Sequence, residues 1–315
     1  MLIAQAMSMK RFRVAEHSMT PTLQPGDEVV ASDARTPVPG DLVVFEHPGR
    51  PDFWMIKRLI DDTGWVMSDN LEVAGTDSRT LGRIPVGQML RVVGDLDSET
   101  FREACALLAD EDESLAGAIL RWGVPEFWHR HAGFGTLVLL ILEQQVSLES
   151  GAAMYRRLTR LTGQVDPGSV ISAGEDALRS IGVTRQKAAY LMGLARQVVT
   201  GALDLQAVAA APTETARGML MAVKGIGAWT ADAYLLSALR RPDVWPVGDR
   251  ALQVGAGEVL GMAATPNEEE LGLIGEPWRP VRAAAARLIW HTYLRGRGRA
   301  EPPDPMHAHM ARPDA

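Results

Sequence analysis

The spacing of apolar residues changes near residue 98, and this change limits the folds open to the chain. Before it, short runs rich in Val, Ile, Trp and Phe are separated by turn sequences such as Pro25-Gly26-Asp27 and Pro39-Gly40-Asp41. Runs of this kind predict short β-strands in a small barrel or sandwich. Beyond it, apolar residues recur at the 3.6-residue spacing of helices, as in Leu137–Val146 and Ala188–Val199. The pattern predicts a multidomain chain, with a small all-β domain followed by an all-α domain.

The length agrees with this division, because 315 residues are enough for two domains of about 150 residues. The tail beyond residue 300 is rich in proline, which is typical of disorder. We therefore expect a β domain over residues 1–97, an acidic linker or helix over 98–117, a helical domain over 118–300 and a disordered tail over 301–315.

Charge is distributed unevenly along the chain. The net charge is −7, but residues 118–300 carry 20 basic and 16 acidic residues, and 18 of the basic residues are Arg. Affinity for phosphate depends on local charge, so the acidic total does not exclude a helical half that binds nucleic acid.

Several classes of protein are excluded or disfavoured. The single cysteine, Cys105, cannot form an internal disulfide or a four-cysteine zinc or iron–sulfur site. The longest aliphatic run, Leu137–Leu142, is far shorter than the ~20 residues that span a bilayer. Residues 1–13 lack the apolar core of a secretory signal, so we expect a cytoplasmic protein with no membrane partner. The histidine pairs His129/His131 and His307/His309 lack further ligand spacing, so no metal or cofactor is predicted.

A serine and a lysine in the β half have the chemistry of a nucleophile and its base. Ser18 precedes a turn at Thr20-Pro21, and Lys57 lies in the middle of a predicted strand. Burial would lower the lysine pKa from about 10.4 and give a neutral amine that accepts a proton. A serine beside such a lysine is a known catalytic pair. The alternative is that Ser18 caps a turn and Lys57 is a solvated strand residue.

The order of motifs over residues 14–95 resembles the bacterial type I signal peptidase family, particularly its small members that lack a membrane anchor. This resemblance implies a Ser-Lys peptidase-like domain with Ser18 as nucleophile, Lys57 as general base and a peptide as substrate. Asp77 and Arg79 match the last structural motif of the family. Ser68-Asp69-Asn70 departs from the usual Gly-Asp-Asn. The motifs are His17–Leu23, Pro39–Phe45, Met55–Arg58, Val66–Asn70 and Asp77–Arg79.

The helical half contains a glycine-rich turn between two apolar helices, at residues 223–229. Gly225 and Gly227 permit positive φ and remove side chains that would block a close approach. Backbone N–H groups of the turn and of the next helix can then hold a phosphate. The pattern indicates a helix–hairpin–helix, which grips a DNA backbone without reading its sequence.

An aspartate follows the hairpin by about twenty residues. Asp249 comes after Pro246-Val247-Gly248 and before a predicted helix that begins at Arg250. A carboxylate near a helix N-terminus is stabilised as an anion. The alternative is that Asp249 only caps this helix.

Residues 119–298 closely resemble the 3-methyladenine DNA glycosylase II branch of the helix–hairpin–helix glycosylase superfamily. The resemblance implies that Asp249 is the essential aspartate. It also implies a monofunctional enzyme, because Trp229 occupies the position where strand-cleaving members have a lysine. Arg250 and Val281 depart from the common apolar and aromatic residues. The matching segments are Ile141–Ser147, Arg185–Lys187, Lys224–Ala231, Arg241–Asp249, Pro277–Arg282 and Arg287–His291.

These motifs assign candidate roles for a base excision repair enzyme that acts on double-stranded DNA containing alkylated bases. Electron-rich rings can hold a cationic base by cation–π attraction. Four tryptophans, Trp122, Trp128, Trp245 and Trp290, are expected in the core. The base-binding candidates are Trp229, Trp278, Gln144 and Gln145. The phosphate-binding candidates are Lys224, Gly225, Gly227, Thr230, Arg185, Lys187 and Arg282.

Two other functions stay open. The chain could be a Ser-Lys endopeptidase that its helical domain tethers to DNA, in which case Ser18 and Lys57 do the chemistry. It could also be a damage-binding regulator that cleaves itself, although the sequence shows no cleavage motif.

Overall fold

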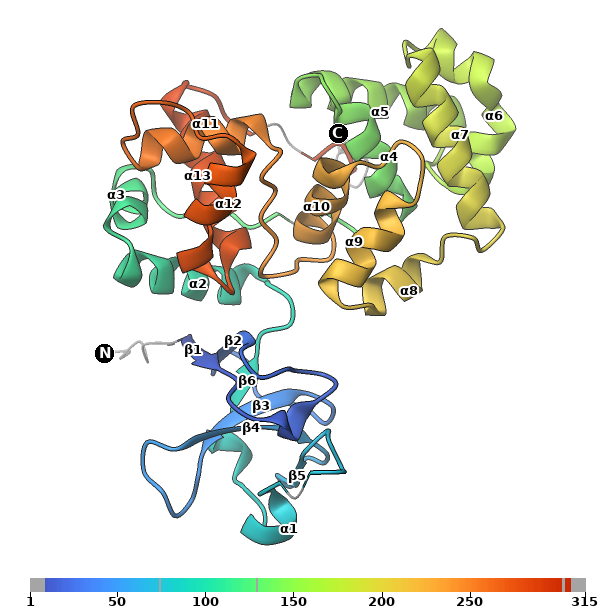
Figure 1. Cartoon of the computed structure of the whole chain (residues 1–315). Helices are drawn as coiled ribbons and strands as arrows, with labels where there is room; N and C mark the ends of the chain where they lie inside the picture. The colour runs from blue at the N-terminus through green and yellow to red at the C-terminus, as the bar shows by residue number, and fades with distance from the viewer. Residues whose placement is uncertain (1–8, 74, 129, 302–303, 307–315) are drawn as a thin grey trace, which may run out of the picture. The chain divides into compact units, whose positions relative to one another are not determined.

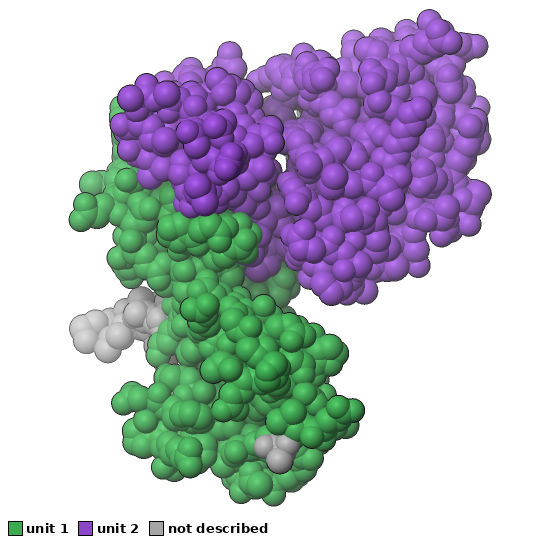
Figure 2. All heavy atoms as spheres, in the orientation of Figure 1, with its two compact units in different colours: residues 1–124, 275–288 green, residues 125–274, 289–315 purple. Residues whose placement is uncertain are grey.

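The computed structural model describes residues 9–73, 75–128, 130–301 and 304–306 (Figure 1). The chain divides into a first unit of residues 1–124 and 275–288, and a second unit of residues 125–274 and 289–315 (Figure 2). The first unit thus includes a segment that the sequence pattern assigns to the helical domain. His129, His307, His309 and most of the predicted disordered tail lie outside the described residues.

A six-stranded antiparallel sheet occupies the N-terminal part of the first unit, as predicted from the short apolar runs and their turns. Its strand order is β1-β2-β6-β3-β4-β5, so that β3 pairs with both β4 and β6. The short helix α1 (Ser78–Leu81) follows β5. The strands are β1 (Lys10–Arg13), β2 (Glu28–Ser32), β3 (Leu42–Glu46), β4 (Trp54–Leu59), β5 (Val66–Met67) and β6 (Leu90–Val92).

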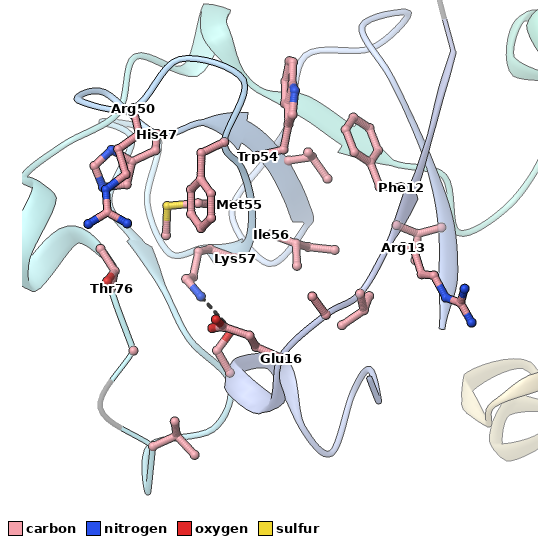
Figure 3. Close-up of a pocket in the computed structure, with 18 residues that line it drawn as sticks. Phe12, Arg13, Glu16, His47, Arg50, Trp54, Met55, Ile56, Lys57 and Thr76 are labelled. Atoms are coloured by element: carbon pink, nitrogen blue, oxygen red, sulfur yellow. Dashed lines mark hydrogen bonds between the residues drawn. The ribbon is translucent and has the colours of Figure 1, made fainter. Parts of the chain in front are cut away.

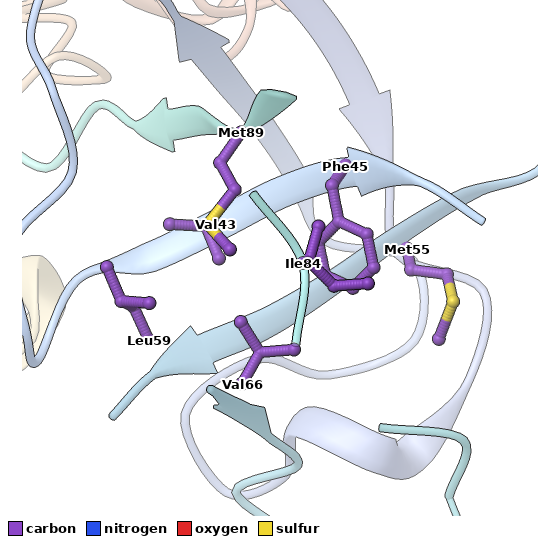
Figure 4. Close-up of a cluster of buried hydrophobic side chains, with 7 residues drawn as sticks. All are labelled: Val43, Phe45, Met55, Leu59, Val66, Ile84 and Met89. Carbon is purple, nitrogen blue, oxygen red and sulfur yellow. The ribbon is translucent and has the colours of Figure 1, made fainter. Parts of the chain in front are cut away.

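Strand alternation places one face of β3 and β4 in the core. Met55, Lys57 and Leu59 are buried along β4, whereas the residues between them are more exposed. Successive strand side chains point to opposite faces, so Lys57 shares the inward face with its apolar neighbours. The other core side chains, shown in Figure 4, are Val43, Phe45, Val66, Ile84 and Met89.

The rest of the first unit is helical. Helix α2 (Ser98–Glu111) begins at a capping box in which the Asp97 side chain accepts from backbone N–H groups. Helix α3 (Glu113–Trp122) follows, and Asp112 caps it in the same way. The 3-10 turn Glu276–Trp278 and residues 282–288 of α13 (Arg282–Gly296) complete the unit.

The second unit is all helical in the residues described, which confirms the prediction for the C-terminal half. Its most apolar helix, α4, is buried from Phe134 to Glu143 apart from Gly135, and it packs against α5, α7 and α10. Every helix among the described residues is too short or too polar to cross a bilayer. Besides residues 289–296 of α13, the helices are α4 (Phe134–Glu143), α5 (Leu148–Thr162), α6 (Pro167–Ser180), α7 (Arg185–Val199), α8 (Leu205–Ala210), α9 (Thr213–Met221), α10 (Ala228–Ser237), α11 (Arg250–Val259) and α12 (Glu268–Ile274).

Candidate functional site

Asp249 lies at the N-terminus of α11, where three N–H groups hold its carboxylate. Oδ1 accepts from the backbone N–H of Leu252 at 2.7 Å and from Trp290 Nε1 at 2.9 Å. Oδ2 accepts from Trp229 Nε1 at 2.6 Å. The helix cap and the tryptophan contacts therefore coexist, and together they fix the orientation of both carboxylate oxygens.

The two indoles reach Asp249 from different helices. Trp229 is the second residue of α10, directly after the hairpin, and Trp290 lies in α13. Both rings are half-buried, and Trp290 also packs on Trp128 with ring centroids 5.0 Å apart. Trp290, which the sequence pattern assigns to the core, is therefore a member of the site. Its place in the motif Arg287–His291 was the one signal that could have identified it.

The glycine-rich turn adopts a hairpin between α9 and α10. Gly225 has φ +99°, and a Cβ there would lie 2.3 Å from Tyr190 Cγ, so only glycine fits. Gly227 is the N-cap residue of α10, and no side chain caps that end of the helix. The first N–H groups of α10 are thus available to an anion, and the exposed Lys224 lies beside them in the sequence.

Gln144 and Thr230 face each other at the hairpin. Gln144 Nε2 donates to the Gly225 carbonyl at 2.8 Å and to Thr230 Oγ1 at 2.9 Å. Thr230 is 1% exposed, so its side chain supports the hairpin from inside, while its predicted phosphate contact stays a prediction. Gln145 is exposed and has φ +57°.

The remaining candidates fall in different places. Trp278 belongs to the first unit, is 3% exposed and donates its indole N–H to Asp112 Oδ2 at 2.9 Å, so little ring surface is open to a base. Arg282 also belongs to the first unit and lies 3.4 Å from Glu276. Arg185 is exposed in the first turn of α7.

A second candidate site lies in the first unit, where Lys57 Nζ donates to Ser18 Oγ at 2.8 Å. Lys57 is 3% exposed and Ser18 is 8% exposed. Burial lowers the pKa of Lys57, and the nearby carboxylates of Asp77, Glu16 and Asp69 oppose that shift without reversing it. The structure thus brings the predicted nucleophile and base together, with the base shifted toward its neutral form.

The dyad faces a cleft of about 460 Å³. Figure 3 shows the Lys57 side chain extending from β4 toward the segment that carries Glu16, and Arg13, Trp54 and Ile56 also line the cleft. β1 is an edge strand that pairs only with β2, and β5 pairs with β4 only at Arg58 and Leu59.

Asp77 and Arg79 hold the loop that follows Ser68. Burial raises the pKa of Asp77, but hydrogen bonds from Arg79 and from the backbone N–H groups of Arg79 and Ser68 outweigh it and hold the pKa at about 2. The Asn70 N–H donates to the Ser18 carbonyl at 3.0 Å. This loop therefore helps to fix the backbone of the candidate nucleophile.

Comparison with known families identifies the helical part. Residues 138–280 match the model of the HhH-GPD superfamily base excision DNA repair protein. The chain contains an HhH-GPD domain. A weaker match, over residues 1–64, is to the signal peptidase, peptidase S26 family.

The curated relatives that resemble this part of the chain include DNA-3-methyladenine glycosylases. The chain is 28% identical over 136 residues to a DNA-3-methyladenine glycosylase of Bacillus subtilis, covering 43% of this chain and 41% of the relative. It is 28% identical over 166 residues to DNA-3-methyladenine glycosylase 2 of Escherichia coli, covering 49% and 56%. The chain thus spans about half the length of the curated relatives it matches.

Solved structures show the same fold. A DNA-3-methyladenine glycosidase from Bacillus halodurans is 28% identical, with a TM-score of 0.55 over 65% of this chain and 95% of that one. A Schizosaccharomyces pombe 3-methyladenine DNA glycosylase in complex with abasic DNA has a TM-score of 0.55 at 22% identity, over 60% and 95%.

Proposed function

We propose that the chain is a monofunctional DNA glycosylase that hydrolyses the N-glycosidic bond of alkylated purines, such as 3-methyladenine, in base excision repair. The observation that carries this proposal is that the Trp229 and Trp290 indoles both donate to the Asp249 carboxylate. Trp229 directly follows a hairpin whose backbone suits contact with a DNA backbone. Its partner is double-stranded DNA that contains alkylated bases. We also propose a cytoplasmic location, the compartment in which such an enzyme would meet DNA in a cell without a nucleus.

The chemistry suits a lone carboxylate. The target nucleotide first leaves the stack, which costs a few kcal/mol and least at damaged pairs. An N-alkylated purine carries positive charge, so it departs without strong acid catalysis. Asp249 then stabilises the oxocarbenium-like sugar and orients the attacking water. The Trp229 and Trp290 rings would stabilise the cationic base by about 0.5–2 kcal/mol each.

The absence of an amine nucleophile at position 229 limits the reaction to base removal. An indole cannot form the Schiff base through which a lysine at this position would cleave the strand. The expected product is therefore an intact strand with an abasic site.

The test is release of 3-methyladenine from methylated DNA by the full chain and by Asp249→Asn. The substitution removes the charge and replaces one acceptor oxygen by an NH2 group, which cannot accept the hydrogen bond of the N–H group that faces it. We expect loss of excision in Asp249→Asn and full activity in the matched control Glu269→Gln, an exposed carboxylate on α12. Equal excision by Asp249→Asn and the wild type would refute the assignment.

We propose a second activity, hydrolysis of a peptide by Ser18 and Lys57 in a signal-peptidase-like domain. The supporting observation is the 2.8 Å contact between the buried Lys57 Nζ and Ser18 Oγ at the cleft. Neutral Lys57 would take the hydroxyl proton as Ser18 attacks the peptide carbonyl, and would return it to the leaving amine.

An acylating probe for serine nucleophiles tests this second activity. We expect labelling of the wild type and no labelling of Ser18→Ala or Lys57→Met. Because the pKa of Lys57 is lowered, labelling should begin below the pH of about 10.4 at which a free lysine loses its proton. Failure to label at any pH up to about 10 would exclude the Ser-Lys mechanism.

A further inference from the structure

The arginines of the β domain are distributed unevenly between ion pairs and the cleft. Residues 1–100 are acidic overall, with 10 basic and 15 acidic side chains, and eight of the basic residues are Arg. Among the described residues, only Arg13 and Arg50 of these eight have no carboxylate partner, and both line the cleft of the Ser18–Lys57 pair. The arginines in ion pairs are Arg11, Arg35, Arg58, Arg79, Arg83 and Arg91. An acidic domain that keeps its unpaired guanidinium groups at one cleft favours an anionic ligand there.

The loop that joins β3 to β4 places Arg50 at one corner of this cleft. The His47 N–H donates to the Phe53 carbonyl at 2.8 Å, and the Phe53 N–H donates to the Arg50 carbonyl at 3.2 Å. The exposed Arg50 guanidinium lies over the Phe53 ring, 5.8 Å from its centroid. Stacking on a ring uses the face of a guanidinium and leaves the N–H groups of its edge for an anion.

His47 adds a second donor at the same corner. Its Nδ1 accepts the Gly49 N–H at 3.0 Å, so Nε2 is the ring nitrogen that can donate. The imidazole also meets the Phe53 ring edge-on, with centroids 6.0 Å apart. His47 and Arg50 therefore both lie against Phe53, and Figure 3 shows them side by side. Two neighbouring donors of this kind match the two oxygens of a carboxylate.

Negative charge in the cleft lies near the dyad and away from this corner. Glu16 is the only carboxylate among the described residues that line the cleft. It precedes Ser18 by two residues, and its charge acts on Lys57. Figure 3 shows Glu16 and Arg50 on different sides of Lys57. An acidic group beside the dyad would be repelled by Glu16, whereas one held by His47 and Arg50 would be attracted.

We propose that His47 and Arg50 bind a carboxylate of the peptide substrate, so that the cleft selects acidic peptides. The inference rests on the proposed peptidase activity of Ser18 and Lys57. The carboxylate can belong to a Glu or Asp side chain or to the C-terminus of a peptide. Since the guanidinium is exposed, the attraction weakens as the salt concentration rises.

Binding of peptides to the full chain carrying Ser18→Ala measures this selection without turnover. The probes are fluorescent, C-terminally amidated peptides of Ala and Ser with Glu at alternating positions, or with Gln at the same positions. We expect roughly tenfold tighter binding of the Glu peptide at low salt, the gain from one charge-assisted pair. A Gln peptide with a free C-terminus identifies the other source, because it binds tighter than its amidated form if the corner holds a chain end. Equal binding of all three peptides would overturn the proposal.

Arg50→Met in the Ser18→Ala chain tests the corner itself and should abolish the preference for the carboxylate. Arg83→Met is the matched control, because Arg83 is an exposed arginine of the same domain that pairs with Asp61 and is not among the residues that line the cleft. It should keep the full preference. A preference that survives Arg50→Met, or that is lost equally in Arg83→Met, would overturn the proposal. Loss in Arg13→Met alone would place the carboxylate beside β1 and refute the assignment to this corner.

A DNA phosphate is the other anion that could occupy the corner. Removing one phosphate contact lowers the slope of log affinity against log salt by about 0.9. We expect duplex DNA to bind Arg50→Met with the wild-type slope. A slope reduced by about 0.9 would overturn the proposal in favour of a nucleic acid contact.

The acylating probe for serine nucleophiles keeps this proposal apart from the peptidase activity. If the wild type is not labelled and the preference for the Glu peptide still depends on Arg50, hydrolysis alone is refuted and the carboxylate site stands. If Ser18 is labelled and no probe peptide shows a preference, the carboxylate site alone is refuted.

Discussion

Replacing Trp290 by Phe removes one of the two indole hydrogen bonds to Asp249 and keeps an aromatic ring beside Trp128. The lost contact is 2.9 Å long and has a carboxylate as acceptor. A hydrogen bond to a charged group contributes about 1.5–3 kcal/mol. If that energy orients the carboxylate toward the sugar, the excision rate falls by roughly ten- to a hundredfold.

The assay is single-turnover release of 3-methyladenine with enzyme in excess, which reports the chemical step. Trp245→Phe is the matched control, because its indole N–H donates to the Leu271 carbonyl. That variant should lose stability and keep its excision rate.

A double-mutant cycle decides whether Trp290 acts through the carboxylate. Adding Trp290→Phe to Asp249→Asn should cause little further loss, since the group that Trp290 positions is already disabled. Wild-type excision by a folded Trp290→Phe, or a full additional loss in the double variant, would refute the reasoning.

Gly225→Ala should destabilise the second unit by about 2 kcal/mol or more, because the added Cβ would overlap Tyr190. Gly227→Ala is the control, because a Cβ there meets open space. Urea unfolding of the two variants measures the difference in stability. The pKa of Asp77 is lowered to about 2, so its contribution to stability is present above about pH 4 and is lost as the pH falls toward 2. Asp77→Asn should abolish that acid dependence in unfolding experiments. Cys105 is fully buried, so a thiol reagent should modify it only on unfolding, and rapid modification of the native chain would contradict the fold.

Local sequence patterns were enough to predict most of the strands of the first unit. Turn residues and β-branched runs located most of the strands, and alternation along β4 accounts for the inward position of Lys57. The contact between Lys57 and Ser18 joins positions 39 residues apart, and only the ordered motifs of the resemblance indicated it.

Two tryptophans show what local patterns leave undetermined. Trp290 and Trp278 both lie in segments that carry the resemblance, yet Trp290 donates to Asp249 while Trp278 is buried and donates to Asp112. Which tryptophan meets the carboxylate depends on how helices pack, and helical spacing does not contain that information. Lys187 is a second example. The sequence does not show whether a lysine in the first turn of a helix will lie in solvent, bind a phosphate or donate to the end of a neighbouring helix, as Lys187 does.

The donors that hold Asp249 are, within the described residues, neutral N–H groups. Such donors orient the carboxylate without carrying a formal positive charge themselves, so a departing base with a formal positive charge is attracted to it. An unmodified purine has no such charge and gains little from the same environment. Discrimination against normal bases can thus originate in the electrostatics of the bond-breaking step, without a pocket that fits one lesion closely.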